Sequence, residues 1–192
     1  MRTTGQQERR YVMGLADRFE TKVNKNPVWK FFLKAETSIS TVCAFIGVLG
    51  VCYNVVGRYI FHKNFFGMDD LLMIVMIFMY FLGSAFASYD EQQISADILT
   101  SFMKNPLKIK SLRAFQEGAS ALVCGVYTVW LFEYVSYNFA GNSRTPVLKV
   151  PYWIPQSALL IGFFFMTVYH IYNMILYVLR TIDLKNAEKE AA

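Results

Sequence analysis

Charged side chains are scarce in this sequence of 192 residues. Asp, Glu, Lys and Arg make up 17% of it, against 55% hydrophobic residues, whereas soluble domains carry about 25% charged residues. Three stretches have no charge at all: residues 37–57, 71–89 and 150–179. A bilayer core about 30 Å thick takes about 20 helical residues, so each stretch is long enough to cross a membrane. The composition therefore argues against an ordinary soluble domain.

A fourth stretch has little charge. Residues 114–143 contain only Glu117 and Glu133 as charged side chains. The sequence therefore predicts an all-α membrane protein whose single domain, residues 1–192, has four transmembrane helices. The predicted spans are residues 36–61, 69–90, 112–139 and 154–180.

Cysteine and histidine are few. The three cysteines, at positions 43, 52 and 124, all fall in predicted spans and imply no disulfide framework. His62 in an outer loop and His170 in the fourth span have no clustered metal ligands around them in sequence, which argues against a haem or metal site. No nucleophile with its base, phosphate loop or zinc spacing occurs. The sequence predicts no enzyme and no cofactor in this chain.

Proline is absent from the interior of the predicted spans. The five prolines, at positions 27, 106, 146, 151 and 155, lie in loops or at helix entrances. Membrane transport sites are usually built where helices break. Four unbroken helices therefore favour a rigid element over a moving gate.

Basic residues are in excess, and they are unevenly distributed. Of the 19 Lys and Arg residues, eight precede residue 36, four lie in residues 91–113, and three follow Leu179. Only four, Arg58, Lys63, Arg144 and Lys149, lie at or in the other two loops. The positive-inside rule then predicts cytoplasmic N- and C-termini and a cytoplasmic middle loop. The net charge of +5 reports topology, and we expect no nucleic-acid partner.

Two short segments with one apolar face are expected on the cytoplasmic side. Apolar residues recur at helical spacing from Val12 to Val23 among basic residues, which predicts an amphipathic helix over residues 8–25 on anionic membrane lipids. A floppy basic tail is the alternative. Residues 94–104 have a similar pattern before Pro106 and are too short to cross, which predicts an interfacial helix between spans two and three.

Glutamates in or near the spans are candidate functional sites. Glu117 and Glu133 are 16 residues apart, about 24 Å along a helix, so we expect them to flank the two ends of the third span. Glu36 opens the first span. Each can be an interfacial carboxylate facing water or a neighbouring helix, and each can be a functional group.

Other polar side chains are candidates for contacts within the chain or between subunits. Arg58 ends the first span and Asp69 and Asp70 open the second. An ion pair across this hairpin and separate snorkelling side chains both remain open. The uncharged polar residues expected to form hydrogen bonds between helices are Asn54, His170 and Asn173.

The second and fourth spans have contrasting surfaces. Gly83 and Ala87, and likewise Ser84 and Ser88, lie four residues apart in the second span, which predicts a close helix contact and makes Gly83 and Ala87 candidate subunit-interface residues. The fourth span carries a bulky aromatic surface, expected to face lipid or a large neighbouring subunit. Its members are Phe163, Phe164, Phe165, Tyr169, Tyr172 and Tyr177.

Five short motifs follow one another along the chain. They are GRYIF at 57–61, DDL at 69–71, FLGSAFA at 81–87, ISADIL at 94–99 and VPYWIP at 150–155. In this order the sequence resembles the small membrane subunit, the DctQ type, of tripartite ATP-independent periplasmic (TRAP) transporters. The family often has Trp at the place of Met68 and His at the place of Gln93.

The resemblance implies a complex in a bacterial inner membrane. In it, a large subunit of the DctM type carries the sodium ions and the substrate. A periplasmic binding protein of the DctP type delivers an organic anion, a carboxylate or a sulfonate. The small subunit is then a static scaffold among membrane lipids. The alternative is a self-sufficient four-helix membrane enzyme or small carrier, with a path through Glu117, Glu133 and His170.

Overall fold

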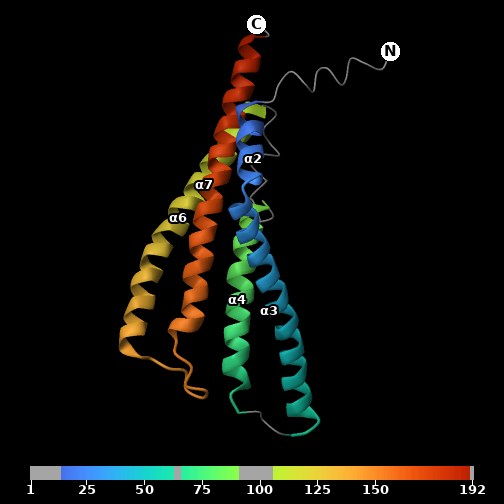
Figure 1. Cartoon of the computed structure of the whole chain (residues 1–192), viewed down its shortest axis with the longest axis vertical. Helices are drawn as coiled ribbons and strands as arrows, with labels where there is room; N and C mark the ends of the chain where they lie inside the picture. Colours follow the sequence, from blue (N-terminus) through green and yellow to red (C-terminus); the bar gives the residue numbers. More distant parts are fainter. Residues whose placement is uncertain (1–13, 63–65, 91–105, 191–192) are drawn as a thin grey trace, which may run out of the picture.

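The fold is entirely helical over the residues described by the computed structural model, which are 14–62, 66–90 and 106–190. Four helices are long and apolar enough to cross a membrane, which confirms the predicted fold class. The predicted interfacial helix over residues 94–104 lies outside the described residues. The helices (Figure 1) are α2 (Leu15–Asn24), α3 (Pro27–Tyr59), α4 (Met68–Tyr89), α6 (Pro106–Gly141) and α7 (Trp153–Glu190).

The four long helices are unbroken, as the positions of the prolines predicted. Pro27 is the first residue of α3, and Asn26 caps that helix because its side chain accepts a hydrogen bond from the Val28 N–H at 3.3 Å. Proline suits the first turn, where its missing N–H would have no helical partner. α4 begins after Gly67, whose φ of +88° favours glycine.

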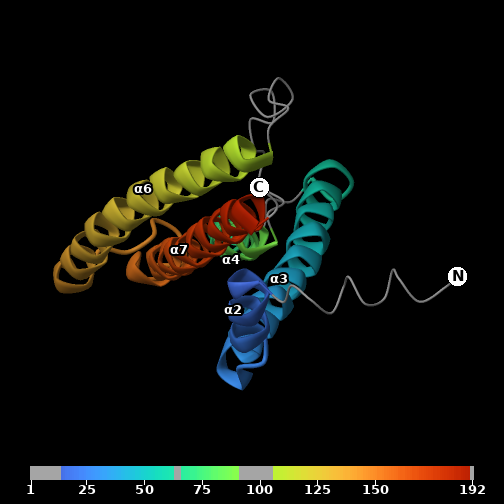
Figure 2. The same ribbon diagram turned by 90° about the horizontal axis from the view of Figure 1, so that it is seen from above.

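The long helices form an open row instead of a closed bundle. α6 packs along α7, α7 along α4, and α4 along α3, and Figure 2 shows α6 and α3 on opposite sides of α7. The N-terminal part of α3 reaches α7, where the rings of Phe32 and Phe165 lie 5.4 Å apart. In the most apolar part of α7, 39% of residues are buried, against 6% in α3 and in α6.

The aromatic residues of α7 mostly lie inside the protein. Tyr169, Tyr172 and Tyr177 are only 1%, 8% and 5% exposed. Of the six aromatic residues assigned to an outward surface, Phe164 alone is exposed, at 52%. The prediction of a lipid-facing or partner-facing aromatic surface is therefore wrong for the tyrosines. The reason is that α7 is an inner helix of the row and has neighbours on both sides.

The small residues of α4 pack within the chain. Ser88 is buried on the side of α7, and a Cβ added to Gly83 would lie 3.0 Å from the hydroxyl oxygen of Ser40 in α3. α4 also approaches the backbone of α7 closely, because a Cβ on Gly162 of α7 would lie 2.9 Å from the carbonyl oxygen of Phe81. Ala87 is half-buried.

The helix α2 docks on the C-terminal half of α7 and on the start of α3. Its residues Ala16, Phe19 and Val23 pack in one cluster with Tyr172 and Leu176 of α7. A helix is thus present over Leu15–Asn24, within the predicted residues 8–25, and apolar side chains of this helix pack inside the chain. Residues 1–13 lie outside the described residues, and contact of α2 with lipid stays a prediction.

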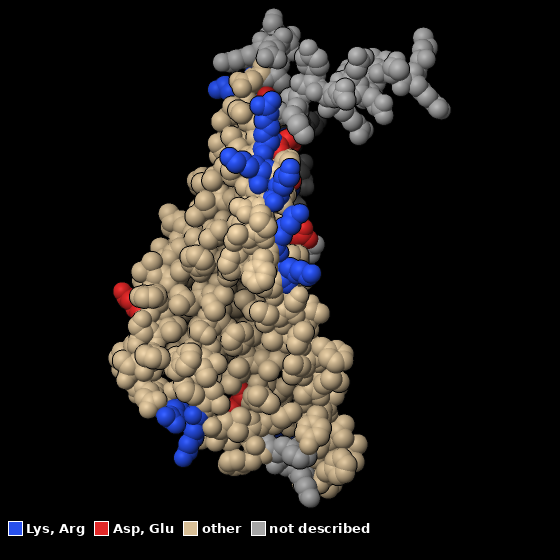
Figure 3. Space-filling model, viewed as in Figure 1, with Lys and Arg blue, Asp and Glu red and all other residues tan. Residues whose placement is uncertain are grey.

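Charge separates along the long axis of the molecule. On the face seen in Figure 3, most of the visible Lys and Arg side chains lie toward the end that carries both chain termini, above a broad surface with few charges. This surface is rich in exposed apolar side chains on the outer helices, for example Phe45 of α3 and Phe132 of α6. Such a belt is typical of a protein that spans a membrane.

Candidate functional site

Glu36 is buried against α7. Glu36 belongs to α3, and its Oε2 accepts a hydrogen bond at 2.7 Å from the hydroxyl of Tyr169 on α7. The ring of Trp29, two turns earlier on α3, meets Tyr169 edge-on at 5.4 Å. The other carboxylate oxygen of Glu36 and the indole N–H of Trp29 are buried without a hydrogen-bond partner among the described residues. Glu36 therefore faces a helix partner and not water.

Glu117 and His170 join α6 to α7. The Nδ1 atom of buried His170 lies 2.7 Å from Oε2 of Glu117. One turn earlier on α6, Arg113 donates a hydrogen bond to the Tyr177 hydroxyl at 3.2 Å. The two contacts hold α6 against α7, the one described helix with which it packs extensively. His170 therefore forms a contact between α6 and α7.

Asn173 joins α7 to the end of α4. Its amide nitrogen donates to the carbonyl oxygen of Ser88 at 3.0 Å. Ser88 is in the last turn of α4. Asn173 therefore bridges two spans at this end of the helix.

The outer hairpin does not contain the ion pair that the sequence left open. Asn54 of α3 donates a hydrogen bond to Asp69 of α4 at 3.0 Å. Asp70 accepts hydrogen bonds from the backbone N–H groups of Val147 and Leu148, at 3.2 and 2.9 Å.

Arg58 makes no ion pair or hydrogen bond with any residue in the described part of the chain. The two aspartates instead accept hydrogen bonds from the Asn54 amide and from backbone N–H groups.

The hydrogen bonds from the Val147 and Leu148 N–H groups to Asp70 attach the loop between α6 and α7 to the start of α4, and this contact is called the Asp70 clasp below. This loop is folded on itself, since the N–H of Thr145 donates to the carbonyl of Val150 at 2.8 Å and the Val150 N–H donates to the Thr145 hydroxyl at 3.0 Å. Thr145 is buried. The start of the second span therefore fixes the connection between the third and fourth.

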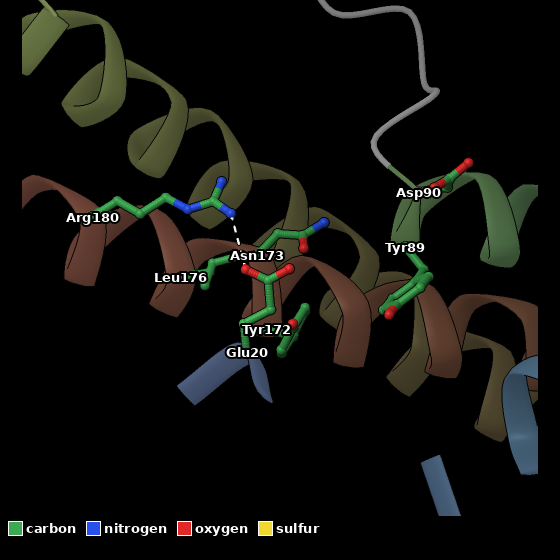
Figure 4. A pocket seen from close by; sticks show the side chains of 7 residues that line it. All are labelled: Glu20, Tyr89, Asp90, Tyr172, Asn173, Leu176 and Arg180. Atoms are coloured by element: carbon green, nitrogen blue, oxygen red, sulfur yellow. Dashed lines mark hydrogen bonds and ion pairs between the residues drawn. The ribbon is translucent and has the colours of Figure 1, made fainter. Parts of the chain in front are cut away.

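A polar pocket of about 230 Å³ lies where α2, α4 and α7 meet. Figure 4 shows Arg180 of α7 reaching Glu20 of α2, with Asn173 and Tyr172 beside them. The Arg180–Glu20 distance is 3.2 Å, and the Tyr89 hydroxyl donates to Asn24 of α2 at 2.8 Å. These polar groups attach α2 to the spans.

Asp183 completes the attachment of α2. Its Oδ2 accepts a hydrogen bond at 3.1 Å from the backbone N–H of Ala16, in the first turn of α2. The residue before this helix, Gly14, has no side chain with which to cap it. Asp183 therefore performs, from α7, the task that an N-cap side chain usually performs locally.

Glu133 stands apart from the other two glutamates. It is exposed on α6 and has no hydrogen bond or ion pair with the described residues. It borders an apolar groove between α6, α7 and Phe32 of α3. The structure thus brings Glu117 and His170 together and leaves Glu133 about 24 Å along the helix from them. Among the described residues, no group of three or more His, Cys, Asp or Glu side chains could hold a metal ion.

Several of these contacts were not predicted from the sequence. Tyr169 lies 133 positions from Glu36, and Asp183 lies 167 positions from Ala16, so no local pattern links them. Gly162 does carry a signal, because it is a small residue beside three consecutive phenylalanines and small residues mark close helix contacts.

A comparison with known protein families finds a match to most of the chain. Residues 47–180 match the family described as "Tripartite ATP-independent periplasmic transporters, DctQ component". No match to a curated protein was found. The matched stretch is more than half of the chain and includes α4, α6, most of α7 and the clasp at Asp70. The chain therefore belongs to the DctQ family, the small membrane subunit of TRAP transporters.

Proposed function

We propose that this chain is a non-catalytic scaffold in a sodium-coupled TRAP transporter of a bacterial inner membrane. The observation that supports a static role best is the pairing of polar groups within the spans. Glu36, Glu117 and Asn173 each bond to a neighbouring helix of the same chain. Such contacts fix the order and spacing of the row, and they leave these groups occupied in holding helices.

The rest of the machinery belongs to partner proteins in this proposal. A large membrane subunit of the DctM type binds the sodium ions and an organic anion, a carboxylate or sulfonate. A periplasmic protein of the DctP type delivers the anion. Membership in the DctQ family supports association with other TRAP components. The charge separation in Figure 3 supports an orientation with both termini in the cytoplasm.

Reconstitution of the complex in vesicles tests the scaffold role. We expect no sodium-driven uptake from this chain alone, and uptake when the large subunit and binding protein are added. Glu117→Gln should leave the sodium dependence of uptake unchanged when uptake is expressed per assembled complex. A normal amount of complex with abolished uptake, or with altered sodium dependence, would contradict a scaffold.

One contact favours the alternative of a self-sufficient membrane enzyme or small carrier. Glu117 and His170, at 2.7 Å, could exchange a proton. The third proposed member, Glu133, is too distant to join them. Turnover or transport by the chain alone in vesicles, lost in His170→Gln and kept in Asn54→Ala, would favour this alternative over the scaffold.

A further inference from the structure

An apolar groove opens along α6 and α7 on the side toward the start of α3. Its volume is about 830 Å³, and its lining includes Phe32, Phe132, Ile161 and Phe164. Phe132 and Phe164 are 64% and 52% exposed. The groove exists because α6 packs extensively against α7 alone and lies far from α3 in both Figure 1 and Figure 2.

The groove lies at membrane depth. Near its outer end, the rings of Phe139 and Trp153 pair at 5.8 Å, and tryptophan is typical of the membrane–water interface. Glu133 is six residues before Phe139 along α6, about 9 Å deeper. Ile161 lies at a similar depth on α7. The carboxylate of Glu133 therefore lies on the membrane side of this aromatic pair, at the edge of the apolar groove.

A carboxylate at that depth requires a partner. Charged groups inside a bilayer are costly and usually pair with another polar group. Glu36 and Glu117 each have a polar partner within the chain. The Glu133 side chain has no such partner among the described residues. The groove thus combines an aromatic surface with one unsatisfied acceptor.

We propose that this groove receives a transmembrane helix of the large TRAP subunit, and that this helix presents a hydrogen-bond donor, such as Lys or Arg, to Glu133. The inference rests on the proposed function, which supplies the large subunit. Lipid chains could cover the aromatic lining but could not satisfy the carboxylate. A second copy of this chain docked through the same groove would add a second Glu133, which repels the first.

Photo-crosslinking tests the location of the contact. A benzoylphenylalanine at position 164 should crosslink to the co-expressed large subunit. The matched control carries benzoylphenylalanine at position 45 instead. Phe45 is 68% exposed on α3 and lies outside the groove, so this variant should crosslink mainly to lipid. Equal protein adducts from both positions, or only lipid adducts from position 164, would overturn the assignment of the groove.

Replacement of Glu133 tests the charge. Glu133→Leu should lower the co-purified large subunit about ten-fold, the size expected when an interhelical hydrogen bond is lost, and should leave the folding of the chain alone unchanged. Glu133→Gln keeps an acceptor and should lose less. If Glu133 faces only lipid, Leu will preserve or increase the yield of complex, and the inference fails.

The two tests separate this inference from the proposed function. Wild-type complex that assembles and transports, with unchanged assembly in Glu133→Leu, would refute the groove and keep the scaffold. Transport by the chain alone would refute the scaffold itself.

Discussion

Gly162 of α7 lies so close to Phe81 of α4 that a Cβ on the glycine would stand 2.8 Å from the Phe81 Cβ and 2.9 Å from the Phe81 carbonyl oxygen. The second of these atoms is backbone and cannot rotate away. The two inner helices of the row are therefore held at a separation that only glycine permits.

Gly162→Ala should separate α4 from α7. We expect the loss of packing to cost about 1–3 kcal/mol and to lower the midpoint of thermal unfolding of the purified chain in detergent. Gly125→Ala is the control, because a Cβ there would lie at an ordinary 3.7 Å from Thr167. An unfolding midpoint in Gly162→Ala at or above that of the control would show that the contact is looser than described.

Asp70→Ala should free the loop between α6 and α7. The substitution leaves the N–H groups of Val147 and Leu148 without their acceptor, at a cost of about 1–3 kcal/mol. We expect faster proteolysis between residues 142 and 149 in right-side-out vesicles. Asp69→Ala, which removes only an exposed contact with Asn54, should leave the rate unchanged. Equal rates in both variants would contradict the clasp.

Asp183→Ala should loosen α2. Loss of a helix cap costs about 1 kcal/mol, so backbone amides of residues 15–24 should exchange hydrogen several-fold faster. Lys185→Ala, an exposed neighbour on α7, serves as the comparison. Protection of α2 that stays at the wild-type level would mean that Glu20, Asn24 and the apolar cluster hold the helix without Asp183.

The orientation can be measured with single cysteines in a variant that lacks the native ones. Labelled from the periplasmic side, a cysteine at position 142 should react, whereas cysteines at positions 5 and 106 should not, because the excess of Lys and Arg keeps those segments in the cytoplasm. Reaction at position 106 from outside would reverse the topology.

Hydrophobic run length predicted the four spans well, because lipid imposes a minimum number of apolar residues whatever the partners of a helix are. The contacts of Asn54, His170 and Asn173 with other helices also reflect the lipid surroundings. A polar group in a span must find a donor or acceptor on another helix.

Lateral order could not be predicted in this way. An aromatic run such as the one with Tyr169, Tyr172 and Tyr177 looks the same in sequence whether it faces lipid or another helix. The tyrosines are buried because α7 is an inner helix of the row. The acceptor of the Leu148 N–H is Asp70, 78 residues away, and no local pattern in the sequence links these two residues.

The open row also determines how much helix surface the chain exposes to lipid or to a neighbouring subunit. A compact bundle of four helices hides one side of every helix, whereas here α3 and α6 are each packed extensively on only one long helix. The perimeter available to lipid is accordingly large for a chain of 22.1 kDa. Purified by itself, this protein should carry a heavier detergent belt than a compact four-helix bundle of equal mass, and that belt should shrink once a neighbouring subunit covers one of its sides.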